Sequence, residues 1–244
     1  MDGKHVGIKC PAKSGSNFFN YKNFFSIVLF AIVDADYKFI YIDVGKNGRI
    51  SDGGIFANTP IYNKLENGSL RLPADEPLPD RVKNIPFLLV GDEAFPLKSY
   101  LMKPYPNRNL DLTQRIFIYR LSRVRRIVEN VFGILSSRFG VFQKPIPLEP
   151  EKVEKIVMAA CVLHNFLRSK PSSRHIYTPQ ESFDREINGT IIEADWRQMA
   201  GNNGLPNIQQ QGGNKSTTEA REIRDELCDF FNTNGQVSWQ WNAV

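Results

Sequence analysis

Four acidic residues stand at places in the sequence where carboxylates can do chemistry together: Asp2 in DGKH, Asp52 in SDGG, Asp92 in LLVGDEAF and Glu129 in RRIVENVFG. A carboxylate just beyond a buried strand lies at the rim of a sheet, where ligand sites gather. Carboxylates that converge there repel one another unless cations join them, and oxygen ligands suit hard ions such as Mg²⁺ or Mn²⁺. Two such ions about 3.5–4 Å apart stabilise the attacking and the leaving oxygen in phosphoryl transfer. The four acids therefore indicate the layout of a nuclease or a polynucleotidyl transferase.

Three of these acids also have a purely structural interpretation. Asp52 can cap the helix that follows it, and Asp92 can cap a short helix after its strand. Glu129 can form an ordinary helical ion pair with Arg125 or Arg126. However, Glu129 falls within the apolar stripe of its helix, where an acid that faces the sheet needs a cation. On the residues alone, both interpretations stay open.

The elements that must position these acids begin with a hairpin. Residues 25–33 (FSIVLFAIV) form an apolar run of strand length, which is typical of a strand buried on both faces. Residues 37–44 (YKFIYIDV) alternate with period two, so we predict an antiparallel hairpin. After a stretch at 71–84 that we interpret as an exposed loop, residues 85–90 (IPFLLV) are predicted to form the next buried strand. That strand ends directly before Asp92.

Helices are predicted after the hairpin and after the strand at 85–90. Residues 55–65 are weakly helical. In residues 113–138 the apolar side chains, Val124 among them, recur at three- and four-residue steps, which predicts one buried stripe of a long helix. A second long helix is predicted over 150–168, with acids in its first turn at the positive end of the helix dipole.

The charge of the chain is unevenly distributed. Residues 1–170 carry 25 Lys and Arg against 16 Asp and Glu, a net charge of +9, and residues 171–244 carry 6 against 10, a net charge of −4. A basic body favours a polyanionic partner, although a solvated basic surface is the alternative. In the acidic part, residues 201–215 are typical of a low-complexity linker, and Ser216 with Glu219 predicts a capping box for a short helix. We therefore expect a core over 1–170 and an acidic, partly disordered tail over 171–244.

Basic residues gather on the helix that carries Glu129. The arginines are Arg115, Arg120, Arg123, Arg125, Arg126 and Arg138. On a helix that brings a metal ligand to the site, they are well placed to contact the phosphates of flanking DNA, and a solvated helix face is the alternative. Lys4, Lys9, Lys13 and Lys22 extend this basic track in a role limited to contacts with the DNA backbone.

Other residue types exclude several classes of protein. Cys10, Cys161 and Cys228 are scattered and show no C-x-x-C spacing, which argues against a disulfide framework and against a zinc cluster. The apolar run at 24–33 is too short to cross a bilayer, and no secretory signal opens the chain, so we expect a soluble, intracellular protein. His5 and His164 are interpreted as structural residues.

Six strings, taken in order, resemble the endonuclease core of Harbinger-type transposases and their domesticated nuclease relatives. They are DGKH, NYK…SIVLFAIVDADYKFIYIDVG, GRISDGGIF, LLVGDEAFPL, RLSRVRRIVENVFGIL and AACVLHNFL, and together they cover about residues 1–170. The resemblance implies an α/β fold, an RNase H-like mixed sheet flanked by helices, whose first strand is here interpreted as truncated on its N-terminal side. It also implies that Asp2, Asp92 and Glu129 are the catalytic DDE triad and metal ligands, with Asp52 as a further metal ligand.

The function that the resemblance implies is metal-dependent cleavage of DNA phosphodiesters. The implied cofactor is a divalent cation, Mg²⁺ or Mn²⁺, bound as two ions. Expected partners are DNA, a Myb-like DNA-binding helper protein and further copies of the chain, and the expected location is the nucleus. The alternative is a catalytically inactive, domesticated module that keeps the fold and binds DNA or a partner.

Overall fold

The sheet that carries the first of the four acids is antiparallel and has three strands. A computed structural model describes residues 1–50, 52–187, 189–199, 205–208 and 216–243. Its main sheet joins β1 (Asp2–Gly7), β2 (Ser26–Val33) and β3 (Phe39–Asn47) in the order β1-β2-β3. The hairpin predicted from the two apolar runs is therefore confirmed as β2 and β3.

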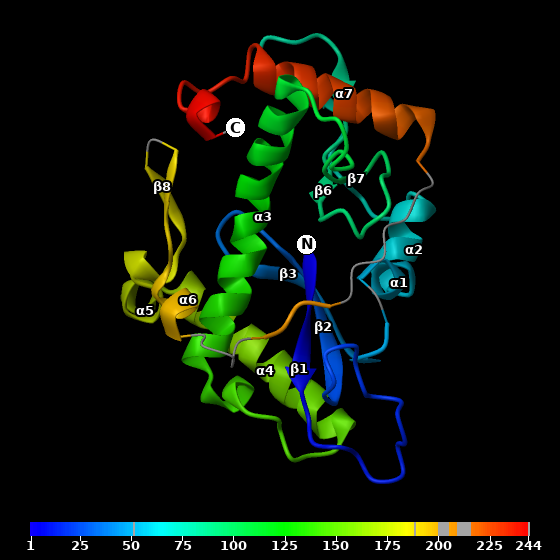
Figure 1. Cartoon of the computed structure of the whole chain (residues 1–244), viewed down its shortest axis with the longest axis vertical. Coiled ribbons are helices and arrows are strands. Elements are labelled where there is room, and N and C mark those ends of the chain that lie inside the picture. The colour runs from blue at the N-terminus through cyan, green and yellow to red at the C-terminus, as the bar shows by residue number, and fades with distance from the viewer. Residues whose placement is uncertain (51, 188, 200–204, 209–215, 244) are drawn as a thin grey trace.

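Helices cover both faces of this sheet, so the molecule has three layers (Figure 1). On one face α3 (Leu112–Arg138) and α4 (Pro150–Ser169) pack against Leu29 and its neighbours on β2. On the other face α1 (Asp52–Ala57) and α2 (Pro60–Glu66) pack against Phe30. Because side chains alternate between the faces of a strand, a strand covered on both sides is buried along its length. The mixed α/β class that the sequence predicts is confirmed.

The strand predicted over 85–90 is wrong in its extent. Regular pairing is limited to β5 (Asn84–Ile85) and β6 (Leu89–Val90), because Pro86 between them has no N–H to donate to a sheet. β5 pairs with β4 (Glu76–Pro77) inside the region predicted as loop, and β6 runs parallel to β7 (Leu101–Met102). The amino group of Met1 donates to the carbonyl of Val90 at 2.7 Å, which sets β6 beside the start of β1.

The long helix predicted over 113–138 is confirmed as α3. Its start is held by Asp111, whose side chain accepts the N–H of Gln114 at 2.8 Å while the side chain of Gln114 accepts the N–H of Asp111. This capping box satisfies two donors that the start of a helix otherwise leaves unpaired. The sequence pattern places Val124 in the buried stripe, but Val124 is 47% exposed, because it lies between the two hydrophobic clusters that α3 joins.

The weak helix predicted over 55–65 is in fact two helices, α1 and α2. The hydroxyl of Thr59 donates to the carbonyl of Phe56 at 2.7 Å and accepts the N–H of Tyr62 at 3.2 Å, so one helix ends and the next begins at this residue. The second long helix, predicted over 150–168, is confirmed as α4.

The C-terminal part of the chain contributes further elements that pack on the core. They are α5 (Pro171–Tyr177), β8 (Arg185–Ile187), β9 (Thr190–Ile192), α6 (Asp195–Met199) and α7 (Thr218–Asn232), with the short 3-10 helices η1 (Gly140–Gln143), η2 (Gln180–Ser182) and η4 (Gln240–Ala243). Most of the linker predicted over 201–215 lies outside the described residues. The division of the chain into a core and a disordered tail stays a prediction.

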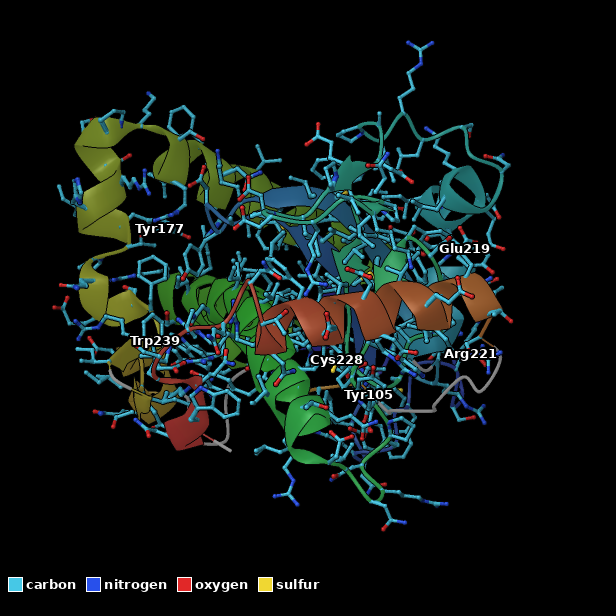
Figure 2. All side chains as sticks on the ribbon, turned by 90° about the horizontal axis from the view of Figure 1, so that it is seen from above. Tyr105, Tyr177, Glu219, Arg221, Cys228 and Trp239 are labelled. Atoms are coloured by element: carbon cyan, nitrogen blue, oxygen red, sulfur yellow. The ribbon has the colours of Figure 1, made fainter. Side chains whose placement is uncertain are left out.

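Helix α7 lies across the N-terminal half of α3 (Figure 2). Ile223 and Leu227 of α7 are buried against Phe117 of α3. The cap predicted for this helix is wrong by one residue, because the side chain that accepts the N–H of Ala220 belongs to Thr217 and not to Ser216. None of the helices in the described part of the chain is long and apolar enough to span a membrane.

Candidate active site

Asp2 is the first residue of β1, and it is buried. One of its carboxylate oxygens lies 3.0 Å from Nζ of Lys4, and the other accepts the N–H of Gly3 at 2.9 Å. Residues two apart on a strand share a face, so the strand itself brings Lys4 to Asp2. Lys4 is only 8% exposed, which makes it inaccessible to DNA in this structure, contrary to the prediction of a backbone contact.

Asp92 follows β6 by two residues and is also buried. Its side chain accepts the N–H of Ala94 at 2.9 Å, so Asp92 stabilises a turn and not the short helix of the alternative structural interpretation. Burial lowers the pKa of the Met1 amino group to about 6, and the charges of Asp2, Arg125 and Asp92 act on it as well. The charges of these three side chains therefore reach the amino group at the start of β1.

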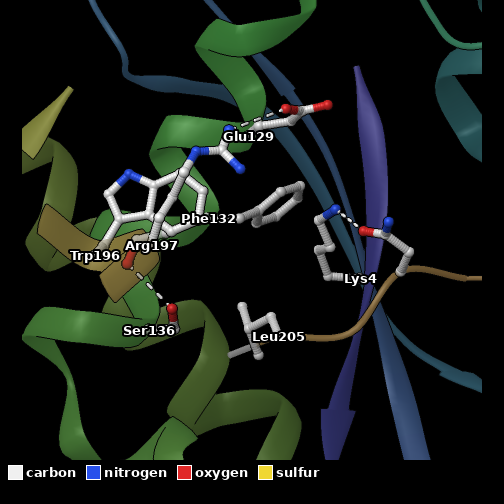
Figure 3. Close-up of a pocket in the computed structure, with 9 residues that line it drawn as sticks. Lys4, Glu129, Phe132, Ser136, Trp196, Arg197 and Leu205 are labelled. Carbon is white, nitrogen blue, oxygen red and sulfur yellow. Dashed lines mark hydrogen bonds and ion pairs between the residues drawn. The ribbon is translucent and has the colours of Figure 1, made fainter. Parts of the chain in front are cut away.

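Glu129 faces β1 from α3 across a cavity of about 260 Å³ (Figure 3). Its carboxylate lies 3.5 Å from Arg125 on the same helix and 3.6 Å from Arg197 of α6. The helical ion pair with Arg125 that the sequence leaves open is thus present. Lys4 lines the opposite wall of the same cavity, so the partner of Asp2 and the carboxylate of Glu129 share one space.

The three described acids come from β1, from the end of β6 and from α3, and cations link their surroundings. Lys4, the partner of Asp2, lines the cavity that Glu129 lines, and Arg125, a partner of Glu129, lines the cavity beside Asp92. Among the residues that the structure describes, no group of three or more His, Cys, Asp or Glu side chains is arranged to hold a metal ion. Instead, Lys4 balances the charge of Asp2, and Arg125 with Arg197 balances that of Glu129. Asp52 is the first residue of α1, and its side chain lies outside the described residues.

A second cavity, of about 510 Å³, opens beside Asp92. Arg115 and Arg125 of α3 line it, together with the rings of Tyr105 and Tyr119. Arg115 is exposed, as the DNA contact predicted for it requires. The cavity thus places guanidinium groups and aromatic rings next to a buried carboxylate.

Several of the predicted DNA-binding arginines are occupied by the C-terminal part of the chain. Arg126 forms a hydrogen-bonded ion pair with Glu186 of β8, and Arg123 lies 3.4 Å from the same carboxylate. Arg120 donates to the carbonyl of Gly235 at 2.8 Å and lies over a phenylalanine ring of α7. Arg138 donates to the hydroxyl of a serine in η2 at 3.4 Å.

Both histidines singled out in the sequence are structural. His5 is fully buried, and its Nδ1 lies 2.9 Å from the hydroxyl of Ser26. His164 joins the hydroxyl of Tyr177 at 2.8 Å to the carbonyl of Tyr37 at 2.7 Å. Burial lowers the pKa of each imidazole to about 4, so both are neutral at pH 7.

The site residues that the sequence does not reveal are Glu186, Arg197 and Asn207. Each contacts a residue of the site from far along the chain, and no local spacing encodes such a contact. The one signal in the sequence is the opposite charge of the two parts of the chain, +9 against −4.

The sequence of this three-layer α/β fold matches a known family. Residues 1–165 match the family described as DDE superfamily endonuclease, and the chain belongs to that family. The resemblance to Harbinger-type, transposase-derived nucleases is therefore confirmed. The family implies the use of divalent metal in general.

Similar proteins occur in a plant and in mammals. The chain is 29% identical over 174 residues to the Arabidopsis thaliana protein named "Protein ALP1-like", and the alignment covers 68% of this chain and 42% of the relative. It is 24% identical over 205 residues to the Mus musculus protein named "Putative nuclease HARBI1", with coverage of 78% and 53%. The Homo sapiens protein of that name is 24% identical over 207 residues, with coverage of 80% and 54%. The chain thus spans about half the length of these relatives, and no solved structure matches it significantly.

Proposed function

We propose that the chain is the core of a DNA endonuclease that cleaves phosphodiester bonds with the help of two divalent cations, Mg²⁺ or Mn²⁺. In this proposal Asp2, Asp92 and Glu129 hold the cations, and Asp52 is a further ligand. The observation that supports it is that Arg125 pairs with Glu129 and lines the cavity beside Asp92, while Lys4 pairs with Asp2 and lines the cavity beside Glu129. DNA is the proposed partner and the nucleus the proposed location. A Myb-like helper protein and a homo-oligomer stay predictions.

An RNase H-like topology is part of the same proposal. It is supported by the sheet order β3-β2-β1 and by the pair β6 and β7, which forms a separate parallel sheet linked to the start of β1 by the hydrogen bond from Met1 to Val90. In this order Asp2 begins β1 and Asp92 follows β6, while Glu129 lies on α3, the helix that packs against the sheet. A rigid strand and a long helix are the elements that hold ligands in place best.

The donor set fits hard divalent cations, because the proposed ligands offer only carboxylate oxygens. The chemistry that two such ions supply when bound is activation of water for in-line attack and stabilisation of the leaving oxygen. The chain itself supplies the carboxylates and the guanidinium of Arg125, which lines the cavity beside Asp92 and is suited to a phosphate oxygen.

The proposal is tested by nicking of supercoiled plasmid DNA by the 244-residue chain with Mg²⁺ or Mn²⁺. We expect metal-dependent nicking that falls by about 10³-fold or more in Asp92→Asn and in Glu129→Gln. Asp75→Asn changes the net charge equally in an exposed loop and should leave the nicking rate unchanged. Persistence of nicking in both site variants would contradict the proposal.

A second candidate function is a catalytically inactive module that binds DNA or a protein partner. The ion pairs at the site favour it, because cations of the chain already neutralise Asp2 and Glu129. This function predicts salt-sensitive DNA binding in EDTA and no metal-dependent nicking by the unmodified chain. The nicking assay therefore separates the two candidates.

A further inference from the structure

The C-terminal part of the chain places an acid on the arginines of α3 and a cation on Glu129. We propose that Tyr119, Arg123 and Arg126 of α3 form a binding site for a phosphate of the DNA backbone, and that Glu186 of β8 occupies this site as an internal competitor. This inference rests on the proposed function, because it names the DNA contact of that site and the segment that regulates access to it.

Glu186 makes the contacts that a backbone phosphate would make. One carboxylate oxygen accepts the hydroxyl of Tyr119, and the other accepts from Arg126 and lies 3.4 Å from Arg123. Burial acts to raise the pKa of Glu186, but the bonds from Tyr119 and Arg126 together with the charges of Arg123 and Arg126 outweigh it and lower the pKa. The side chain is 3% exposed, so the three donors enclose an anion.

The position of this anion relative to the catalytic acids suits a substrate. Arg126 precedes Glu129 by three residues, and residues three apart are neighbours on one helix face. A phosphate held by Arg126 would therefore lie within one helical turn of a proposed metal ligand. Tyrosine hydroxyls and arginine forks are common donors to DNA phosphates.

The same C-terminal segment also neutralises Glu129. Asp184 accepts two hydrogen bonds from Arg197, at 2.9 and 2.5 Å, and this fixed guanidinium reaches Glu129 at 3.6 Å. Trp196 packs its indole against Gly133 of α3 and donates to Asn130 at 3.3 Å, which anchors α6 in this position.

Further along the chain, residues 206 and 207 contact β1 beside Asp2 and reach its partner Lys4. The carbonyl of Pro206 accepts the N–H of His5 at 2.8 Å, so this segment pairs with β1 along the edge that does not face β2. Asn207 accepts a hydrogen bond from Lys4, the cation that neutralises Asp2. Glu186 thus neutralises arginines of the proposed DNA site, while Arg197 and Lys4 neutralise two of the proposed metal ligands. This charge pattern competes both with DNA and with metal ions.

The test is DNA binding in EDTA, where cleavage cannot occur, measured by fluorescence anisotropy of a labelled duplex over a range of salt. Glu186→Gln keeps the shape of the side chain and removes its charge. We expect a Kd lower by roughly fivefold. The slope of log Kd against log salt should also become steeper, by about one unit for each additional DNA phosphate that the variant neutralises. Glu181→Gln, at an exposed residue of η2, changes the net charge equally and is the matched control.

Two results would overturn the inference. One is an equally lowered Kd in Glu181→Gln, since that would make net charge the cause. The other is an unchanged Kd in Glu186→Gln. In addition, Arg126→Gln in the Glu186→Gln background should restore the weaker binding, whereas an arginine that only holds the tail would leave the tighter binding in place.

A measurement on the unmodified chain covers the case in which Glu186→Gln does not fold. Hydrogen exchange at Arg185–Ile187 should become faster when the DNA duplex is added, because DNA displaces β8 from α3. Unchanged protection of these amides under saturating DNA would contradict the inference. Both readouts are independent of nicking, so a chain that binds in this way without cleaving would refute only the proposed function.

Discussion

Replacing Gly133 of α3 by alanine is expected to destabilise the protein, although the same change in an open helix stabilises it. A Cβ atom at this position would lie 2.5 Å from Cε3 of Trp196 and closer still to two other indole atoms. Alanine gains about 1 kcal/mol of helix propensity over glycine. Overpacking of this kind costs about 1–3 kcal/mol. We therefore expect the free energy of unfolding to fall by about 1 kcal/mol, since the cost exceeds the gain.

The assay is urea unfolding followed by circular dichroism, with three further variants. Gly140→Ala meets open space and should not destabilise the protein. In a Trp196→Ala background the clash is absent, so Gly133→Ala should stabilise by about 1 kcal/mol, which gives a coupling of about 2 kcal/mol between the two sites. A rise in stability for Gly133→Ala in the presence of Trp196 would refute the packing of α6 on α3, and with it the placement of Arg197 at Glu129.

Three further predictions concern buried groups. Burial lowers the pKa of His5 and His164 from 6.5 to about 4, so as the pH falls the unfolded chain binds protons before the folded chain does. The free energy of unfolding should therefore be at its full value above pH 6.5 and decrease as the pH drops toward 4. The expected slope is about 1.4 kcal/mol per pH unit for each histidine, and His164→Gln should reduce it in urea titrations; an unchanged slope would contradict the assignment. Burial raises the pKa of the Cys161 thiol to about 12, so exposed Cys10 should react with a thiol reagent at pH 8 while Cys161 reacts only after unfolding; early modification of Cys161 by mass spectrometry would contradict this. Ile223→Ala should lower the unfolding free energy by about 2–4 kcal/mol, and a loss below about 1 kcal/mol would contradict the docking of α7 on α3.

The elements that local patterns define are predictable from the sequence. Residues 27–33 are apolar throughout and residues 39–44 belong to the alternating run, so period and length alone indicate β2 and β3. The stripe of α3 is equally clear from Val128 to Leu135, where the helix packs on the sheet. The pattern is wrong at Val124, because a sequence pattern does not show where one packing partner ends and the next begins.

The four acids can be singled out from the sequence, but the cations that neutralise Asp2 and Glu129 can be predicted from it only in part. Lys4 follows Asp2 by two residues on a strand, so strand geometry places both on one face. By contrast, Arg197 reaches Glu129 across 68 positions of sequence, and Glu186 reaches Arg126 across 60. Such pairs depend on how the chain returns to α3, and no spacing within either segment specifies it. The pattern also overstates the extent of β6, because Pro86 removes a donor within an otherwise apolar run.

The measurement that tests the central claim most directly is calorimetric titration of the chain with Mn²⁺. If Asp2, Asp92 and Glu129 are metal ligands, the unmodified chain should bind Mn²⁺ saturably, and binding should be lost or greatly weakened in Asp92→Asn and in Glu129→Gln. Arg197→Gln should tighten binding, because it removes a positive charge from Glu129. Absence of saturable Mn²⁺ binding by the folded chain, or equal binding in the two carboxylate variants, would contradict the account.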